Sequence, residues 1–551
     1  MMLVYDSVLP SRSIPTLAGL FAMLVVIYLF QTMFEVIRSE VMLGIANGVR
    51  NDLGHAVHYA TVRRVLRSSR EEGDGMQPVR DLDQVHAFLA GPGPVALIDL
   101  PWVLVFLVVL AALHWTLGLT ALAGAVILAA IALLSTRGTQ AGTRELSRVT
   151  GLRSAAIITQ IRTAEPALAM AMQERLIGRS LAWDDEFIRV QSILSRTVSR
   201  FGGAGRAFRI FLQSMILTVG ALLVIDGKAS GGVILASSVL SGRALAPVDQ
   251  AIANWRGLTA ARTGWARLMD LVAVHRIPPP RNVALPAPSG EIQVSDVWIA
   301  PAGTQNFVIG GASFTLRPGD ALAVIGPSAS GKTTLAKALL GILAPARGEI
   351  RIDGATHDQW DSAVLGASFG YVPQTVELID GTISENIARF DPDATSEAII
   401  AAATAAGLHG LILSMPDGYQ ARVSSGGVEL SAGQRQRLGL ARALYGDPHL
   451  VVLDEANSNL DAAGDAALAA AIEGVKARKG IVVMITHRPA ALGPVTQIAI
   501  LQAGRLADIG ERDAVLARMQ QAEQKPPLKG SSPAPGHAAG PAPAATEGIP
   551  A

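Results

Sequence analysis

The sequence predicts two parts of different fold class, an α-helical membrane domain followed by an α/β domain. Long apolar runs lie before about residue 250, whereas short β-like runs alternate with helix-forming ones after it. Hydrophobic residues make up 50% of the 551 residues and charged residues only 17%, a balance typical of a membrane protein. The net charge of +1 argues against a nucleic-acid binder, and the absence of cysteine excludes disulfides and thiol catalysis.

Five apolar runs predict membrane-spanning helices. The first would be roughly 27 Å long as a helix, close to the hydrocarbon thickness of a bilayer. A cleaved signal peptide is the alternative for it, but no basic segment precedes this run. Asp99 and Pro101 interrupt the second run. Arg209, Gln213 and Arg243 lie in the last two, where we expect them to face a bundle interior or the interface, unless the arginines snorkel at helix ends. The five runs are residues 17–34, 96–115, 117–134, 208–225 and 231–245.

Arginine-rich segments predict the orientation of these runs. The two long segments between them, residues 35–95 and 135–207, carry many arginines, while the two short connections carry almost no basic residue. The positive-inside rule therefore places the long segments, and the half after the last run, in the cytoplasm. Because the runs make five spans and the last one leads into the cytoplasm, the start of the chain is expected outside the cytoplasm.

A glycine-rich loop dominates the second half. It follows the apolar run 321–325 and precedes a helix-forming run, the context that a phosphate-binding P-loop requires. Lys332 is predicted to bind the β- and γ-phosphates and Thr333 to bind Mg²⁺. A chance strand-to-helix turn is the alternative. The residues predicted to bind the phosphates are Gly326, Pro327, Ser328, Ala329, Ser330, Gly331, Lys332, Thr333 and Thr334.

A second apolar run, residues 450–453, ends in Asp454 and Glu455. Buried strands of a parallel sheet are continuously apolar, and ligands bind at their carboxyl ends. Asp454 is thus a candidate Mg²⁺ ligand, and Glu455 a candidate base that orients or deprotonates water. A strand that merely ends in acidic turn residues is the other interpretation.

Further motifs resemble those of the ATP-binding cassette (ABC) family. Residues 430–434 read Leu-Ser-Ala-Gly-Gln, like the family signature with Ala432 in place of a glycine. Gln374 looks like the Q-loop glutamine, residues 458–461 like the D-loop, and His487 like the switch histidine. The resemblance implies ATP and Mg²⁺ as ligands. It also implies catalytic roles for Gln374 and His487 beside Glu455, with Gln374 near the metal as well.

The family resemblance also implies a site shared between two cassettes. Ser431, Gly433, Gln434 and Asp461 would meet the nucleotide on the P-loop of a second copy, in a homodimer or a heterodimer. Two expected features are weak. The residue that stacks on adenine is Trp298, Ala300 or Pro301, and residues 423–427 lack the glutamate with which many exporters contact the partner's membrane loops.

Segments of the membrane half resemble the permease/ATPase of type I secretion systems. They are residues 4–11, 80–85, 91–94, 99–102 and 241–248, with 380–387 and 455–461 in the second half. This resemblance implies unfolded protein substrates with C-terminal signals, a periplasmic adaptor, an outer-membrane channel and the bacterial inner membrane as location. A lipid, peptide or drug exporter and a truncated non-transporting copy are the alternatives. A soluble ABC ATPase is contradicted by the five spans.

The expected domains are a membrane domain (1–275), a linker (276–290), a nucleotide-binding domain (291–520) and a disordered tail (521–551). Related exporters have six spans, and a helix precedes the segment that matches residues 4–11, which we expect to be a loop. A first helix is therefore expected either upstream of Met1 or as lost from the gene.

Overall fold

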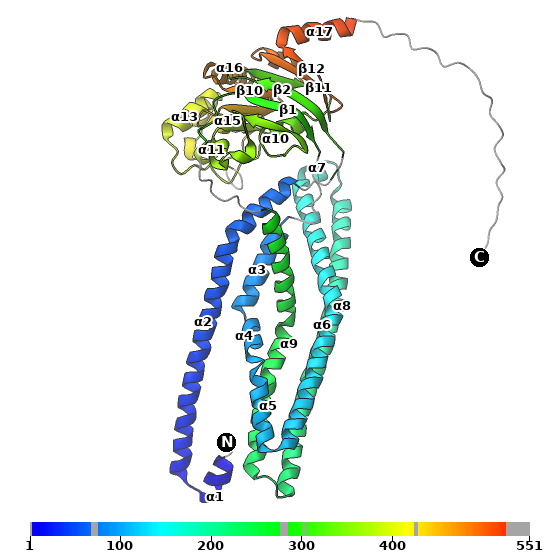
Figure 1. The fold of residues 1–551 in the computed structure, drawn as a ribbon, viewed down its shortest axis with the longest axis vertical. Coiled ribbons are helices and arrows are strands. Elements are labelled where there is room, and N and C mark those ends of the chain that lie inside the picture. The colour runs from blue at the N-terminus through cyan, green and yellow to red at the C-terminus, as the bar shows by residue number, and fades with distance from the viewer. Residues whose placement is uncertain are drawn as a thin grey trace, which may run out of the picture. The chain divides into compact units, whose positions relative to one another are not determined.

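The computed structural model describes residues 3–67, 75–275, 285–300, 304, 306–423 and 428–524. The chain divides into two compact units, Met1–Pro279 and Pro280–Ala551 (Figure 1). Most of the expected linker and of the expected disordered tail, together with Pro301 and the segment 424–427, lies outside the described residues.

The first unit consists of long helices. Four of them are long and apolar enough to span a membrane, and a fifth span results if the bent pair α4 and α5 is counted as one, so the prediction of a helical membrane domain is confirmed. These helices continue far beyond the apolar runs, because the arginine-rich segments are themselves largely helical. The elements are η1 (Val4–Val8), α1 (Leu9–Ser11), α2 (Ile14–Arg67), α3 (Gln77–Ala90), α4 (Pro92–Asp99), α5 (Trp102–Leu113), α6 (Trp115–Arg162), α7 (Ala164–Ala169), α8 (Gln173–Ile225) and α9 (Gly231–Val274).

The segment Val4–Ser11 is helical, so the expectation of a loop there was wrong. Its Asp6 carboxylate accepts hydrogen bonds from Ser230 Oγ (2.8 Å) and from the backbone N–H of Gly232 (3.0 Å). A carboxylate at this position satisfies an unpaired N–H of α9 and complements the positive end of the helix dipole. The contact gives the segment a fixed partner, which favours an ordered turn over a loop.

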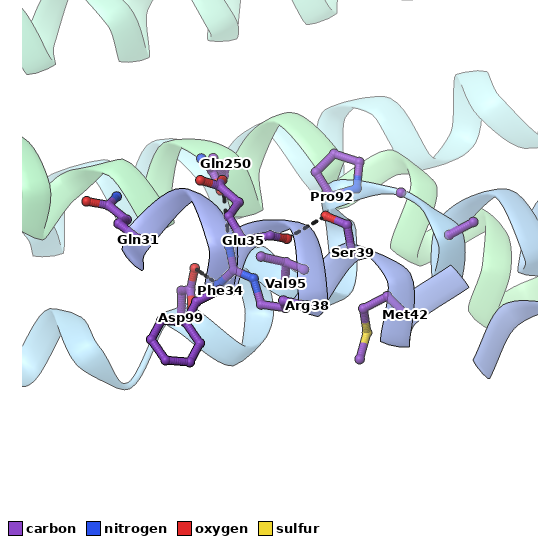
Figure 2. A pocket seen from close by; sticks show the side chains of 12 residues that line it. Gln31, Phe34, Glu35, Arg38, Ser39, Met42, Pro92, Val95, Asp99 and Gln250 are labelled. Carbon is purple, nitrogen blue, oxygen red and sulfur yellow. Dashed lines mark hydrogen bonds and ion pairs between the residues drawn. The ribbon is translucent and has the colours of Figure 1, made fainter. Parts of the chain in front are cut away.

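The second span is bent by 41° between α4 and α5. Pro101 has no N–H to donate, and its ring crowds the preceding turn, so a bend is favoured at this point of the span. Arg38 on α2 donates from one nitrogen to both carboxylate oxygens of Asp99, each at 3.1 Å. Figure 2 shows this pair in a cavity of about 680 Å³ lined by α2, α4 and Gln250 of α9.

Other charges of this unit are also paired between helices. Arg209 on α8 bonds Asp249 on α9 at 2.8 Å, so it faces the bundle as predicted. Asp81 on α3 is 1% exposed and accepts from Arg267 on α9 at 2.6 and 2.8 Å. Arg243 reaches the Tyr28 hydroxyl at 3.3 Å but is otherwise exposed, and Gln213 is exposed, so these two side chains do not lie in the interior of the described bundle.

The second unit is built on a six-stranded sheet in the order β12-β11-β3-β10-β9-β6. Five strands are parallel and β12 is antiparallel. Every residue of β9 and β10 is buried, as continuous apolar runs require. The strands are β3 (Ala321–Ile325), β6 (Phe369–Val372), β9 (Leu450–Asp454), β10 (Ile481–Ile485), β11 (Gln497–Gln502) and β12 (Arg505–Glu511).

Smaller sheets and helices complete this unit. An antiparallel sheet has the order β2-β1-β4-β5, and β7 pairs with β8. The predicted α/β class is confirmed. These strands are β1 (Ile292–Ile299), β2 (Ile309–Leu316), β4 (Arg347–Ile352), β5 (Ala355–Thr356), β7 (Gly381–Thr382) and β8 (Arg422–Val423), and the α-helices are α10 (Lys332–Leu339), α11 (Ser362–Ala367), α12 (Ile383–Ile387), α13 (Ser396–Ala405), α14 (His409–Leu413), α15 (Ala432–Leu444), α16 (Ala462–Ala477) and α17 (Arg512–Gln524).

Candidate nucleotide site

The predicted phosphate loop connects β3 to α10. Gly331 has φ +101°, and a Cβ there would lie 2.6 Å from Ile309 Cδ1. A Cβ on Gly326, whose φ is +153°, would lie 2.1 Å from the carbonyl oxygen of Leu501. Only glycine fits these two positions, and the resulting turn lets successive N–H groups face one point.

Lys332 is the first residue of α10, and its side chain reaches back to the loop. Its Nζ donates to the carbonyl oxygens of Gly326 (2.9 Å) and Pro327 (2.7 Å). Burial lowers the pKa of the Lys332 ammonium, and the nearby carboxylates of Glu455 and Asp454 oppose this shift only in part. An anion in the loop would supply the negative charge that this buried ammonium lacks.

Asp454 ends β9 next to the loop. Its Oδ1 accepts from Thr333 Oγ1 at 3.3 Å, while its buried Oδ2 has no hydrogen-bond partner among the described residues. Burial is the main cause that raises the pKa of Asp454, with Glu455 adding to it and the Thr333 hydrogen bond opposing it. The buried Ser330 Oγ also lacks a partner in this part of the structure. Two unsatisfied oxygens beside a glycine loop fit a bound cation and phosphate.

Glu455 brings the three predicted catalytic residues together. Its Oε2 accepts from Gln374 Nε2 at 3.0 Å, and its Oε1 lies 3.3 Å from His487 Nε2. The three residues follow the carboxyl ends of β6, β9 and β10, which are neighbours in the sheet. Glu455 itself has φ +53°, held by its N–H bond to Ile485 O at 3.0 Å. The arrangement can orient a water molecule beside a phosphate bound in the loop.

The signature segment caps α15. Ser431 Oγ accepts from the N–H of Gln434, and the Gln434 side chain accepts from the N–H of Ser431. A Cβ on Gly433 would lie 2.8 Å from Asn459 O, so glycine is required there. Asp461 caps α16 through Gly464 N–H at 2.8 Å and pairs with Arg437. Among the hydrogen bonds of the described residues, none joins Ser431, Gly433, Gln434 or Asp461 to the phosphate loop of the same chain.

Sequence reasoning missed several residues that support the site. Gln436 is buried on α15 and donates to Glu455 O at 3.1 Å while accepting from Asn459 N at 3.1 Å, which ties the signature helix to the catalytic strand end. Buried Asn457 bonds Thr486 at 3.3 Å. A polar residue on the apolar face of an amphipathic helix was the signal available for Gln436.

An aromatic pair joins β1 to the segment just before β2. Phe307, which the sequence did not single out, packs edge-on against Trp298 with ring centroids 5.2 Å apart. Arg347 lies 5.9 Å from the centre of the Trp298 ring. Trp298 therefore has neighbours on the protein, and the choice between it and Ala300 for the adenine contact stays a prediction.

Comparison with known proteins identifies the class that this fold and site define. The family described as "ABC transporter" matches residues 309–458, and the one described as "ABC transporter transmembrane region" matches residues 2–248. A solved bacterial Atm1-family ABC exporter with ATP bound shares the fold at 20% identity with a TM-score of 0.79, covering 96% of this chain and 95% of that one. The chain belongs to the ABC transporter family, and it couples ATP hydrolysis to transport across a membrane.

Two relatives that match most of this chain identify the kind of ABC transporter. The type I secretion system ATP-binding protein PrsD of Rhizobium meliloti is 46% identical over 96% of this chain and 91% of its own length. The cyclolysin secretion/processing ATP-binding protein CyaB of Bordetella pertussis is 27% identical over 93% of this chain and 72% of its own. Within the ABC family, the chain is a type I secretion ATP-binding protein, and its function is ATP-driven export.

Proposed function

We propose that the chain exports unfolded proteins with C-terminal signals, as the inner-membrane ATPase of a type I secretion system. The convergence of Gln374, Glu455 and His487 beside a loop with unsatisfied buried oxygens is the observation that carries the ATPase part. The secretion part is supported by the relatives, one of which is named for the secretion of cyclolysin.

The residues of the phosphate loop would hold ATP, and Lys332 would neutralise its β- and γ-phosphates. Thr333, Asp454 and Gln374 would hold Mg²⁺, which supplies positive charge to the phosphate oxygens. Glu455 would orient the attacking water and accept its proton. Its carboxylate is held in place for this role, because Oε2 accepts a hydrogen bond from Gln374 and Oε1 lies 3.3 Å from His487 Nε2. His487 would contact the γ-phosphate.

A second copy of the chain would complete each site. Ser431, Gly433 and Gln434 stand at the N-terminus of α15, where free N–H groups favour an anion, yet they make no hydrogen bond to their own phosphate loop among the described residues. We therefore place them, with Asp461, against the nucleotide of a partner copy in a homodimer.

The sequence offers a direct test, because it contains no cysteine. In a Glu455→Gln background, Ser431→Cys and Ser328→Cys in one chain should form a covalent dimer on oxidation only when ATP and Mg²⁺ are present. The Ser431→Cys variant alone is the matched control. Cross-linking to the same extent with and without nucleotide would contradict the shared site. Failure to cross-link when ATP is bound would contradict it as well.

Adaptor and channel partners distinguish protein secretion from lipid, peptide or drug export. We propose a periplasmic adaptor, an outer-membrane channel and a location in the bacterial inner membrane with the ATPase unit in the cytoplasm. Genes for an adaptor and a channel beside this one are the expected finding, because a lipid or drug exporter needs neither. Export that proceeds without both partners would refute this part of the proposal.

A further inference from the structure

A second cavity of the membrane unit has an unusual lining. It measures about 220 Å³ and lies among α3, α6 and α9, in the arginine-rich part of the bundle that we expect on the cytoplasmic side. Its described lining includes Arg144, Arg256 and Arg267 but no aspartate or glutamate. Arg267 is neutralised by Asp81, which leaves two arginines facing a space without a carboxylate.

Arg144 on α6 and Arg256 on α9 have no ion pair or hydrogen bond among the described residues. This separates them from five other arginines of the unit, each of which pairs with an aspartate of another helix: Arg38, Arg50, Arg153, Arg209 and Arg267. Two guanidinium groups from different helices that converge on one cavity attract an anion, because each presents a planar set of donors matched to a carboxylate.

The rest of the lining offers acceptors and amides. Thr139, Thr143 and Thr259 donate their hydroxyl protons to carbonyl oxygens of their own helices at 2.8–3.0 Å, so their oxygens remain free to accept. Gln84 and Gln140 add side-chain amides that can both donate and accept. Such a lining suits a group that carries N–H donors beside its negative charge.

We propose that this cavity binds a carboxylate of the exported polypeptide while an extended segment of that polypeptide lies between α3, α6 and α9. An extended chain presents the required combination, since an Asp or Glu side chain or a C-terminal carboxylate stands next to backbone N–H groups. The hydroxyl oxygens then accept from the peptide N–H groups, and the two arginines neutralise the carboxylate. The inference rests on the proposed function, because it requires a protein substrate.

The test uses the purified full-length chain in detergent with two labelled peptides, a Ser-Asp repeat and its Ser-Asn counterpart, followed by fluorescence anisotropy. The wild-type chain should bind the Ser-Asp peptide at least tenfold more tightly than the Ser-Asn peptide. Combined Arg144→Glu and Arg256→Glu should abolish this preference and favour a Ser-Lys peptide instead. Arg144→Lys with Arg256→Lys keeps the positive charges but lacks the planar donors, so it should prefer the Ser-Asp peptide less strongly than the wild type does. Gain of Ser-Lys binding by the glutamate variant would show that this variant is folded.

Arg137→Glu with Arg262→Glu is the matched control. These arginines lie on the same two helices, are exposed, have no partner among the described residues and do not line the cavity. An equal loss in this control would mean that general surface charge attracts the peptide, and would overturn the proposal.

Other outcomes separate the inference from the proposed function. Equal binding of both peptides by the wild-type chain overturns the carboxylate site and leaves protein export standing. Binding of neither peptide by a chain that hydrolyses ATP also overturns the carboxylate site, whereas protein export is tested separately by the need for the adaptor and the channel. The glutamate variant could instead lose binding of phosphatidylglycerol micelles while its peptide binding stays as in the wild type. That result would assign the cavity to lipid and overturn the proposal.

Discussion

The two units of the molecule treat their internal charges differently. In the membrane unit, Asp81, Asp99 and Asp249 each pair with an arginine of another helix. In the nucleotide unit, Asp454 and Lys332 are buried close together. Among the described residues, however, Asp454 Oδ2 has no hydrogen-bond partner and Lys332 donates only to carbonyl oxygens. Paired charges hold helices together, whereas an unsatisfied buried charge marks a place for a ligand.

Glu455→Gln should have the largest effect, on activity. We expect the ATPase rate to fall at least hundredfold, the usual order for the loss of a general base, while ATP binding persists. Glu473→Gln on α16 removes a carboxylate paired with Lys476 at the surface and should leave the rate unchanged. Wild-type turnover in Glu455→Gln would remove Glu455 from the mechanism.

Asp81→Ala should have an intermediate effect, on stability. It removes three hydrogen bonds to a buried carboxylate, two from Arg267 and one from Gln77, so we expect a loss of about 2–3 kcal/mol in denaturant unfolding. Asp83→Ala on the same helix breaks the exposed pair with Arg50 and should cost only about 0–1 kcal/mol. Equal losses for the two variants would contradict a structural role for the buried pair.

Asp454→Asn should have the smallest effect, and it should stabilise the nucleotide-free chain. The substitution removes a buried carboxylate, so we expect the unfolding temperature to rise by about 2–4 °C, the shift that about 1 kcal/mol produces in a domain of this size. The variant should at the same time lose stabilisation by Mg²⁺-ATP.

The extra stability of the Asp454→Asn variant over the wild type should depend on pH. The pKa of Asp454 is raised in the folded chain, so between its ordinary value of about 3.9 and the raised value the folded state binds more protons than the unfolded state. Wild-type stability therefore falls relative to the variant as pH rises through this interval, and the two converge at lower pH. If calorimetric scans show that the extra stability of Asp454→Asn decreases as pH rises, the raised pKa of Asp454 is not what destabilises the wild type.

Local sequence was enough to single out residues that the structure brings together at one edge of the parallel sheet, but not the contacts between the membrane helices. The glycine loop and the end of β9 are short segments with fixed conformations, and the parallel strands β6, β9 and β10 then bring Gln374, Glu455 and His487 to one edge. The pair between Asp81 and Arg267 and the cap that Asp6 forms on α9 join residues about two hundred positions apart. The hydrophobic periodicity of the sequence does not predict such pairs, because they depend on how whole helices pack against one another.

The central claim is that a second copy of the chain completes the nucleotide site, where buried polar groups lack partners among the described residues of one chain. The most direct measurement is the ATPase rate of mixed dimers made from Lys332→Ala and Ser431→Arg subunits. Each mixed dimer would hold one doubly damaged site and one intact site, so we expect activity above that of either variant alone. Mixtures no more active than the separate variants, although mixed dimers form, would contradict a site built from two chains.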